Sequence, residues 1–537
     1  MAGDGPAAGT QTEVETKLEV PAGAAEAVAA LLRPGSALQD LPGVAEVRAE
    51  DPVELVATYH DTPRLHLLRA RATLRRRTGG EDAGWHLKLP GREAGSRTEV
   101  HEPLGADDGP VPERLAALSR SRHRGRPLAP VAVLRTRRRV VRLLDADGRQ
   151  LVEVADDAVR TEVADALVAA GHEAASTWHE VEVELVDGDR DVLEAVVALV
   201  REAGAWEPDA ASKLGRALAA AGALDAAGTT GAAARTGGDA PAAGSALAVV
   251  VEALRQHVER LVAEDALVRL DVPDSVHKAR VAARRLRSDL ATFRPVLGRG
   301  TTEPLRASLT ELGTVLGRAR DSEVLAARLR ARLAALPPEL VPGPVAGRLD
   351  ADLDGAYERE RAAAVGHLDS EEHTRLLEDL VRLCEDPTRG PRADAPARRT
   401  TRARARRAWR RVQRRLDAVP TEPGPGRDEA LHEVRKATKR VRYAAEALAD
   451  VHGRRASRLA GRAEDLQELL GEHQDAVVAA DALRVVALRA YADGENTFGY
   501  GVLAGLERAA TAGLGPDDPR LERAVRRLRR AAARWFD

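Results

Sequence analysis

The chain has 537 residues and a mass of 57.4 kDa, which is long for one hydrophobic core and predicts at least two domains. Its 44% hydrophobic and 31% charged residues exclude a disordered chain, and a single cysteine excludes an internal disulfide or a cysteine-based zinc cluster. Residues 1–240 carry 29 basic and 39 acidic groups, whereas residues 241–537 carry 53 and 45, so an acidic half precedes a basic half.

No run approaches the roughly 18 apolar residues of a membrane span, and the first residues lack the pattern of a secretory signal. We therefore expect a cytoplasmic protein. Only 5 Trp, 5 Tyr and 3 Phe are present, which argues against base stacking as a main binding mode. We therefore do not expect a nucleic-acid partner.

Residues 12–222 alternate with period two in eight segments, which is typical of strands with two different faces. Eight antiparallel strands are enough to close a barrel. The expected strands are 13–20, 54–60, 71–78, 84–90, 97–103, 132–144, 149–155 and 177–186. Helices are expected outside the barrel at 24–33, 161–171, 189–203 and 212–221.

Charged residues concentrate on one face of these strands. Glu13, Glu15 and Lys17 share a face of the first strand, and Glu180, Glu182 and Glu184 share a face of the last. A solvated sheet face would explain such alternation. Three neighbouring glutamates repel one another, however, and a divalent cation with a polyanion would resolve that repulsion. Both interpretations remain open from the residue pattern alone.

Nine segments in order resemble the CYTH family of triphosphate tunnel metalloenzymes. They are Glu13–Lys17, Tyr59–Thr62, Leu74–Arg77, Trp85–Pro90, Arg97–Glu99, Arg135–Arg137, Glu153–Asp157, Glu180–Glu184 and Ser212–Leu214. The resemblance covers nearly all of residues 12–222. It implies an eight-stranded antiparallel β tunnel that holds a triphosphate, uses Mg²⁺ or Mn²⁺ and cleaves the terminal phosphoanhydride by attack of water.

The resemblance also assigns roles residue by residue. The metal side would comprise Glu13, Glu15, Glu180 and Glu182, with Glu184 and Asp157 as further ligands. The triphosphate side would comprise Lys17, Arg75, Arg77, Lys88, Arg135, Arg137 and Lys213. Glu13, Glu15 and Lys17 are the candidate catalytic residues, with Lys17 orienting the water or the terminal phosphate. Which arginine of residues 135–139 faces the tunnel stays open.

Residues 223–245, rich in Ala, Gly and Thr, predict a flexible linker, and residues 246–537 predict long amphipathic helices. Pro/Gly breaks are expected near 295–304, 337–347, 387–396, 420–426 and 512–519. The fold class is therefore α+β multidomain, with an all-α second domain. Within it, a basic motif recurs after 155 residues, which predicts a duplicated bundle. The motif comprises His277, Arg280, Arg284 and Arg287, repeated as His432, Arg435, Lys439 and Arg442.

This motif, together with Gly317–Asp321 and Gly471–Asp475, resembles the CHAD family of helical domains. The resemblance implies binding of inorganic polyphosphate by the two basic stripes and by Arg320. The second copy has Gln474 at the position of Arg320. Polyphosphate binding would also allow the protein to associate with polyphosphate granules. The arginine-rich segment 398–415 is interpreted as a solvated face. The alternatives are a non-catalytic polyphosphate scaffold, or an enzyme of nucleotide or thiamine triphosphate, such as an adenylyl cyclase or a thiamine triphosphatase.

Overall fold

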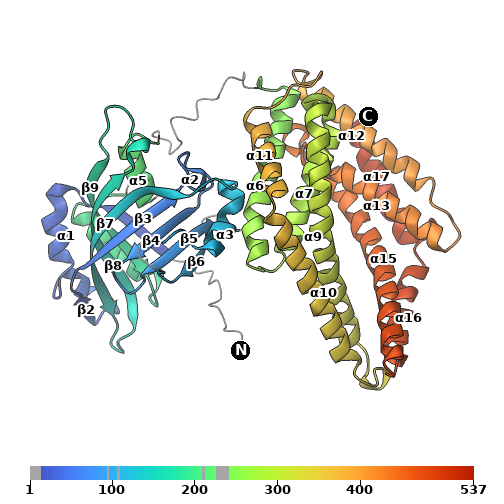
Figure 1. The fold of residues 1–537 in the computed structure, drawn as a ribbon, viewed down its shortest axis with the longest axis horizontal. Coiled ribbons are helices and arrows are strands. Elements are labelled where there is room, and N and C mark those ends of the chain that lie inside the picture. Colours follow the sequence, from blue (N-terminus) through green and yellow to red (C-terminus); the bar gives the residue numbers. More distant parts are fainter. Residues whose placement is uncertain (1–13, 93–95, 106–108, 208–211, 225–240, 537) are drawn as a thin grey trace. The chain divides into compact units, whose positions relative to one another are not determined.

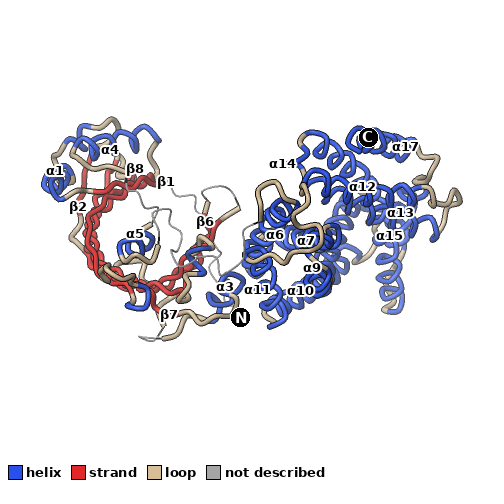
Figure 2. Tube along the Cα trace, turned by 90° about the horizontal axis from the view of Figure 1, so that it is seen from above, coloured by secondary structure: helices blue, strands red, loops and turns tan. Residues whose placement is uncertain are grey.

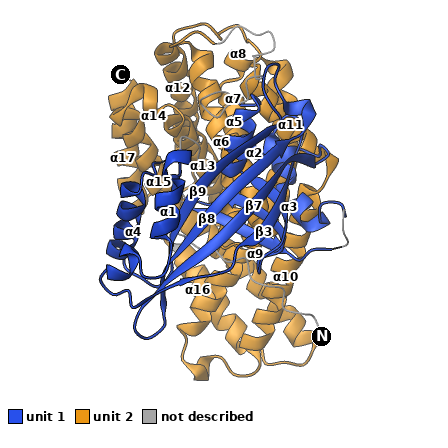
Figure 3. Cartoon of the chain, turned by 90° about the vertical axis from the view of Figure 1, so that its left-hand side faces the viewer, with its two compact units in different colours: residues 1–234 blue, residues 235–537 orange. Residues whose placement is uncertain are grey.

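The computed structural model describes residues 14–92, 96–105, 109–207, 212–224 and 241–536. The chain divides into two compact units, residues 1–234 and residues 235–537 (Figure 3). Among the described helices, none is both long enough and apolar enough to cross a membrane. Glu13, a predicted site residue, lies outside the described residues.

The first unit is built on one antiparallel sheet (Figure 1). Its strands are β1 (Val14–Glu19), β2 (Glu46–Ala49), β3 (Val53–Asp61), β4 (Thr73–Thr78), β5 (Gly84–Pro90), β6 (Arg97–Glu102), β7 (Ala129–Leu144), β8 (Gln150–Val163) and β9 (Ala175–Leu185). Their order is β1-β9-β8-β7-β3-β4-β5-β6, and β2 pairs with β7. Within the described residues, β1 and β6 do not pair with each other. The sheet is strongly curved and has a concave face (Figure 2).

Apolar residues of β1, β7, β8 and β9 point to the convex face, where α1 (Ala25–Leu31) and α4 (Arg190–Glu202) cover them. The helix α5 (Lys213–Ala220) lies on the concave side instead (Figure 2). Its Leu214 and Leu218 pack with Tyr59 and Val159. The prediction that residues 212–221 cover the outside of the sheet is therefore wrong, because this helix buries its apolar face against one end of the concave surface.

Two further predictions differ from the structure. Residues 161–171 do not form a helix, because β8 continues to Val163 with Thr161 and Val163 buried and Glu162 exposed, and a short 3-10 helix (Asp165–Leu167) follows. The strand β2 was not predicted, since its four residues are too few to establish an alternation. The remaining helices of this unit, α2 (His66–Arg69) and α3 (Glu113–His123), follow β3 and β6.

The second unit is all-helical. Its helices are α6 (Ala246–Arg269), α7 (Ser275–Thr292), α8 (Arg294–Leu297), α9 (Arg299–Ala334), α10 (Val345–Leu368), α11 (Glu371–Glu385), α12 (Ala397–Leu416), α13 (Pro425–Glu446), α14 (Ala449–His452), α15 (Arg454–Ala492), α16 (Phe498–Ala512) and α17 (Pro519–Phe536). The break expected at 295–304 is shorter than predicted, because α9 begins at Arg299 and continues through Pro304, which lies inside the helix.

Helix contacts in this unit reproduce the predicted duplication. The helix α7 packs against α6 and α9, and α13 packs against α12 and α15 in the same way. The two sets meet where α7 contacts α13 and where α9 contacts α15. One hydrophobic core runs through both sets and includes Leu286 of α7 and Val441 of α13. The duplicated basic helices therefore lie side by side at the junction of the two repeats.

Candidate active site and anion-binding surface

Charged side chains line the concave face of the sheet because directly paired residues in neighbouring strands share a face. Lys17 of β1 pairs with Glu182 of β9. Asp157 of β8 pairs with Glu180 on one side and with Arg138 of β7 on the other. This register places the acidic residues of three strands on one surface.

Asp157, Glu180 and Glu182 form a carboxylate cluster in which one oxygen of each residue lies within 4.8 Å of the others. Asp157 is 0% exposed and Glu180 is 6% exposed. The Nζ atom of Lys213 lies 2.8 Å from Asp157 Oδ2, 2.8 Å from Glu180 Oε1 and 3.0 Å from Glu182 Oε1. The Ser212 hydroxyl accepts a hydrogen bond from Gly215 N and begins α5 here, which places Lys213 at the cluster.

Two further cations contact the carboxylate cluster. Arg138 Nε donates to Asp157 Oδ1 at 2.8 Å, and Arg138 Nη2 donates to Glu182 Oε2 at 2.7 Å. Lys17 forms an ion pair with Glu182 and lies 3.1 Å from Glu15 Oε2. The three carboxylates are thus neutralised by Lys17, Arg138 and Lys213.

These contacts change the ionisation of the site. Burial alone would raise the pKa of Glu182, but the positive charges around it outweigh burial and hold that pKa far below its usual range. Burial likewise opposes the charge of Lys213, but the three carboxylates outweigh it and raise the pKa of its ammonium group. Glu182 and Lys213 are therefore both charged at neutral pH.

The donor set of the carboxylate cluster fits a divalent ion. Three carboxylates supply the hard oxygen ligands that Mg²⁺ and Mn²⁺ take in proteins. Lys213 already lies among all three carboxylates, so the cluster accommodates a positive charge between its oxygens. Trp178 Nε1 donates to Glu180 Oε2 at 2.5 Å and orients that carboxylate, as hydrogen bonds to metal-binding carboxylates do.

A basic wall faces the same concave surface from β4 and β5. Arg75 pairs with His86, and Lys88 lies 3.1 Å from Glu99 Oε2. Burial lowers the pKa of Arg77, and the charges of Arg75 and Arg138 lower it further, because these cations are crowded. The concave face therefore carries carboxylates on β8 and β9 and cations on β4 and β5, an arrangement suited to a phosphate chain with a metal ion.

Two predicted phosphate ligands lie elsewhere. Arg135 and Arg137 are exposed on the convex face, where Arg135 pairs with Arg160. The residue of this run that reaches the carboxylate cluster is Arg138. Because successive residues of a strand point to opposite faces, Arg137 and Arg138 cannot share one. The buried Leu134 and Thr136 show that the even-numbered residues of this part of β7 face the concave side. The sequence hides this alternation, because the next three residues are all arginines.

Glu15 and Glu184 lie further along the concave face, paired with each other across β1 and β9. Glu184 also pairs with Glu153 of β8. Neither residue belongs to the group of three carboxylates within 4.8 Å, so their predicted metal role is not supported by close approach. Trp178, the hydrogen-bond donor to Glu180, was not predicted, because a buried aromatic residue in a strand is most often interpreted as core.

In the helical unit, Arg280 and Arg284 of α7 meet Arg435 and Lys439 of α13 and form what we call the basic cluster. Burial lowers the pKa of Arg284, and Arg280 and Arg435 lower it further. Arg284 also stacks over the ring of Tyr443, with its guanidinium carbon 5.4 Å from the ring centroid. The two stripes that the sequence repeat predicts are therefore adjacent in space.

Lys439 is partly buried among the other cations of the basic cluster. Burial and the charges of Arg284, Arg435 and Arg280 lower its pKa to about 6, although Asp475 opposes the shift. A lysine with this pKa is mostly neutral at pH 7. An anion among these side chains would remove the repulsion that lowers the pKa.

The glycines of the repeated motif each lie next to an arginine of the basic cluster. A Cβ atom on Gly317 of α9 would lie 3.5 Å from Arg280 Nη2, and a Cβ atom on Gly471 of α15 would lie 3.3 Å from Arg435 Nη2. The same neighbours recur in both repeats, with the closer approach at Gly471. Arg280 is further held by Asp321, at 2.9 Å.

The remaining predicted residues of this surface differ in their surroundings. The pKa of His277 is lowered by burial and by Arg320, and the pKa of His432 is lowered by burial and by Lys436. Arg287 lies near other cations, whose charges join burial in lowering its pKa.

Two further residues predicted to bind polyphosphate have acidic partners, as Arg280 does. Arg442 lies 2.6 Å from Glu446 and 2.5 Å from Glu464, and Arg320 lies 2.8 Å from Glu323. These ion pairs were not visible in the motif because neither Glu446 nor Glu464 belongs to it. The basic cluster is defined without these two arginines, whose binding of polyphosphate stays a prediction.

Fold and site together define a charged, curved antiparallel sheet joined to a duplicated basic helical bundle. Residues 11–218 match the CYTH domain and residues 252–484 match the CHAD domain, so the chain belongs to the proteins that combine a CYTH domain with a CHAD domain.

Relatives of this chain include the uncharacterized protein Rv2226 of Mycobacterium tuberculosis. It is 36% identical over 510 residues, which is 91% of this chain and 94% of that protein. Human thiamine-triphosphatase is 46% identical over 67 residues, 12% of this chain and 26% of that protein. The CHAD domain from the plant Ricinus communis has a TM-score of 0.43 at 24% identity and covers 52% of this chain and 92% of that structure.

Proposed function

We propose that the CYTH domain hydrolyses the terminal phosphoanhydride of inorganic triphosphate with the help of a divalent cation. The observation that carries this proposal is the opposition of two walls on one concave face, the carboxylate cluster on β8 and β9 and the cations of β4 and β5. Triphosphate combines high negative charge with metal affinity, so it complements both walls.

In the proposed reaction, water attacks the terminal phosphorus, the bridging P–O bond breaks, and pyrophosphate and orthophosphate leave with the proton of the water. Arg75, Arg77 and Lys88 would neutralise the phosphate oxygens. Lys17 and Arg138, which contact Glu182, would orient the terminal phosphate. Fixed cations around the reacting group make a serine or cysteine nucleophile unnecessary.

Asp157, Glu180 and Glu182 would hold Mg²⁺ or Mn²⁺. When bound, such an ion would lower the pKa of a water ligand and would act as a Lewis acid towards the phosphate. Lys213 helps to keep Glu182 ionised, because its positive charge lowers the pKa of that carboxyl. The described part of the chain thus supplies both the ligands and the charges that the reaction needs.

We propose further that the basic cluster of the CHAD domain binds inorganic polyphosphate. The lowered pKa values of Arg284 and Lys439 support this, because crowded cations gain most from an anion that relieves their repulsion. Polyphosphate presents a negative charge at every unit and no base, which suits a basic surface on a chain with few aromatic residues.

The experiment that tests the enzymatic proposal measures phosphate release from inorganic triphosphate, thiamine triphosphate, ATP and long polyphosphate, with and without Mg²⁺ or Mn²⁺. We expect turnover to need metal and to be fastest with inorganic triphosphate. Fastest turnover of thiamine triphosphate would support the second candidate, which the similarity to human thiamine-triphosphatase favours. Absence of turnover with every substrate would leave a non-catalytic scaffold.

Polyphosphate binding should depend strongly on ionic strength. If the four side chains of the basic cluster each neutralise one phosphate, affinity should fall by about 50-fold between about 50 mM and about 200 mM salt. Fluorescence anisotropy of a labelled polyphosphate, repeated across a series of KCl concentrations, measures this slope. An affinity that stays constant across the series would contradict electrostatic binding.

Polyphosphate binding at about pH 8 should take up about one proton, because Lys439 is neutral in the free protein and charged in the complex. The pKa of Lys439 rises on binding, so affinity should strengthen as the pH falls towards about 6 and then level off. His277 and His432 stay neutral at about pH 8, since burial lowers the pKa of both.

Isothermal titration calorimetry in buffers of different ionisation enthalpy measures this proton uptake. Lys439→Met should abolish the buffer dependence. Lys436→Met is the matched control, because Lys436 is exposed and lies 2.9 Å from Glu433. Equal binding enthalpies in all buffers for the natural protein would show that Lys439 does not change its charge.

A further inference from the structure

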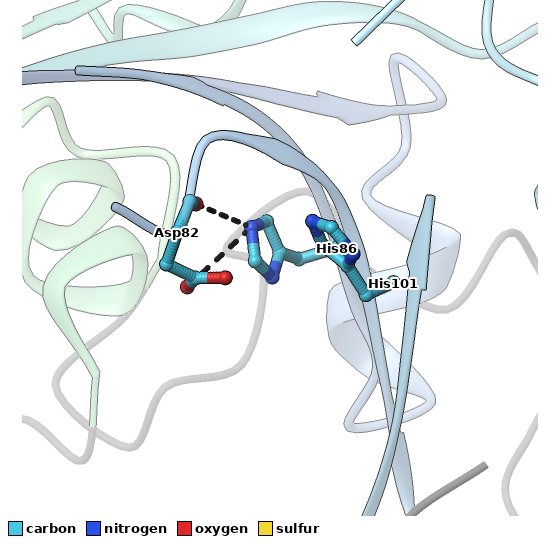
Figure 4. A group of neighbouring side chains, drawn as sticks. All are labelled: Asp82, His86 and His101. Carbon is cyan, nitrogen blue, oxygen red and sulfur yellow. Dashed lines mark hydrogen bonds and ion pairs between the residues drawn. The ribbon is translucent and has the colours of Figure 1, made fainter. Parts of the chain in front are cut away.

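We propose that Asp82, His86 and His101 form a second metal site, which binds a divalent ion such as Zn²⁺, Co²⁺ or Ni²⁺. Each residue offers one donor atom, and these atoms lie within 4.8 Å of one another. Figure 4 shows His86 between Asp82 and His101. The site belongs to β5, β6 and the turn before β5, whereas the carboxylate cluster belongs to β8 and β9.

The fold brings the three residues together by strand pairing and a tight turn. His86 and His101 are direct partners across β5 and β6, so their side chains share a face and their rings lie 4.8 Å apart. Gly79 and Gly80 have φ values of 82° and 70°, which are left-handed conformations that favour glycine. They turn the chain after β4 and bring Asp82 next to His86.

Gly84 makes room for the imidazole of His101. A Cβ atom on Gly84 would lie 2.1 Å from His101 Nε2, so another residue at this position would exclude the ring from its place. His101 is exposed, yet its ring leans back over β5 towards the turn that carries Asp82. This position suits a ligand that shares an ion with His86.

Both ring nitrogens of His86 face oxygen acceptors, which a metal ion or a second ring proton would satisfy. Its Nδ1 lies 3.1 Å from Glu99 Oε1, and its Nε2 lies 3.1 Å from the carbonyl oxygen of Asp82 and 3.6 Å from Asp82 Oδ2. All of these oxygens are acceptors, whereas a neutral imidazole has one N–H. When Nδ1–H donates to Glu99, the lone pair of Nε2 faces the oxygens of Asp82. A metal ion bound by Nε2 and by Asp82 would turn this repulsive arrangement into an attractive one.

The arrangement matches the chemistry of known metal sites. Two imidazoles and one carboxylate favour Zn²⁺, Co²⁺ or Ni²⁺ over Mg²⁺, which takes oxygen ligands. A ligating histidine usually donates its other N–H to a carboxylate, as His86 does to Glu99. Asp82 is oriented in turn by Arg77 at 3.3 Å. Three protein ligands leave a coordination position free for water or an anion.

Co²⁺ titration of the full-length protein tests this site, because cobalt bound by histidine has characteristic visible absorption. Excess Mg²⁺ occupies the hard-oxygen ligands of the carboxylate cluster during the titration. We expect one Co²⁺ site, from which Zn²⁺ displaces the cobalt. His101→Ala and Asp82→Asn should each lower the Co²⁺ affinity by at least about 10- to 100-fold, which is the loss seen when only a hydrogen-bond partner of a ligand is removed. Both residues are exposed, so neither change removes core packing.

His172→Ala is the matched control, since His172 is exposed and lies outside the group of three ligands. It should bind Co²⁺ like the natural protein. Absence of Co²⁺ absorption in the natural protein would overturn the proposal. Equal Co²⁺ affinity in the natural protein and in His101→Ala would overturn it as well. Neither outcome depends on triphosphate turnover, so the proposed activity is tested separately.

Discussion

Glu182→Gln is expected to reduce triphosphate turnover by about 100-fold or more, while the protein stays folded. The glutamate contacts Lys17, Arg138 and Lys213 and belongs to the carboxylate cluster, so one change removes a metal ligand and the partner of three cations. Glutamine keeps the shape of the side chain but lacks the charge. Initial rates of phosphate release under saturating Mg²⁺, with circular dichroism as a check of folding, measure the effect.

Glu162→Gln is the control for this experiment. Glu162 is an exposed carboxylate on the same strand as Asp157 and lies on the opposite face of the sheet. Its substitution removes the same charge without touching the concave face and should leave turnover unchanged. A Glu182→Gln protein as active as the Glu162→Gln protein would separate the carboxylate cluster from catalysis.

Arg284→Gln/Arg435→Gln should weaken polyphosphate binding by about 100-fold at low salt. Each arginine belongs to the basic cluster, one from each repeat, and lies among other cations. Charge-assisted hydrogen bonds contribute about 1.5–3 kcal/mol each, so two lost contacts correspond to at least about two orders of magnitude in affinity. The salt slope should become shallower by about two counterions. Anisotropy of a labelled polyphosphate measures both quantities.

Arg410→Gln/Arg414→Gln removes the same charge from the exposed face of α12. This control tests the interpretation of residues 398–415 as a solvated face. It should lower affinity only slightly, through the general loss of positive charge. If it weakens binding as much as the change of Arg284 and Arg435 does, the polyphosphate surface lies on α12 rather than at the junction of α7 and α13.

Much of the fold was predictable, because period two and the 155-residue repeat are local properties of the sequence. Glu180, Glu182 and Lys17 share the predicted face because the strands that carry them alternate regularly. Arg138 was not predictable, since the run Arg137–Arg139 offers cations in both phases and only strand register selects one. The position of α5 likewise depends on which side of the sheet its apolar face meets, and periodicity carries no such information.

The helical unit shows the same limit. The repeat predicted that His277 and Arg280 have counterparts in His432 and Arg435, and the contacts to Gly317 and Gly471 agree with it. Pairing between distant positions was not visible in the sequence, as the contact of Arg442 with Glu464 on α15 shows. Charge at a motif position therefore predicts a basic surface, but tertiary contacts decide which cations stay available to a ligand.

The most direct test of the central claim follows inorganic triphosphate by ³¹P nuclear magnetic resonance in the presence of the full-length protein and Mg²⁺ or Mn²⁺. Cleavage of the terminal phosphoanhydride predicts that the triphosphate signals decay while pyrophosphate and orthophosphate appear in equal amounts, and that a chelator stops the reaction. Triphosphate signals that persist unchanged with either metal would contradict the claim that the two charged walls of the concave face form a triphosphatase site.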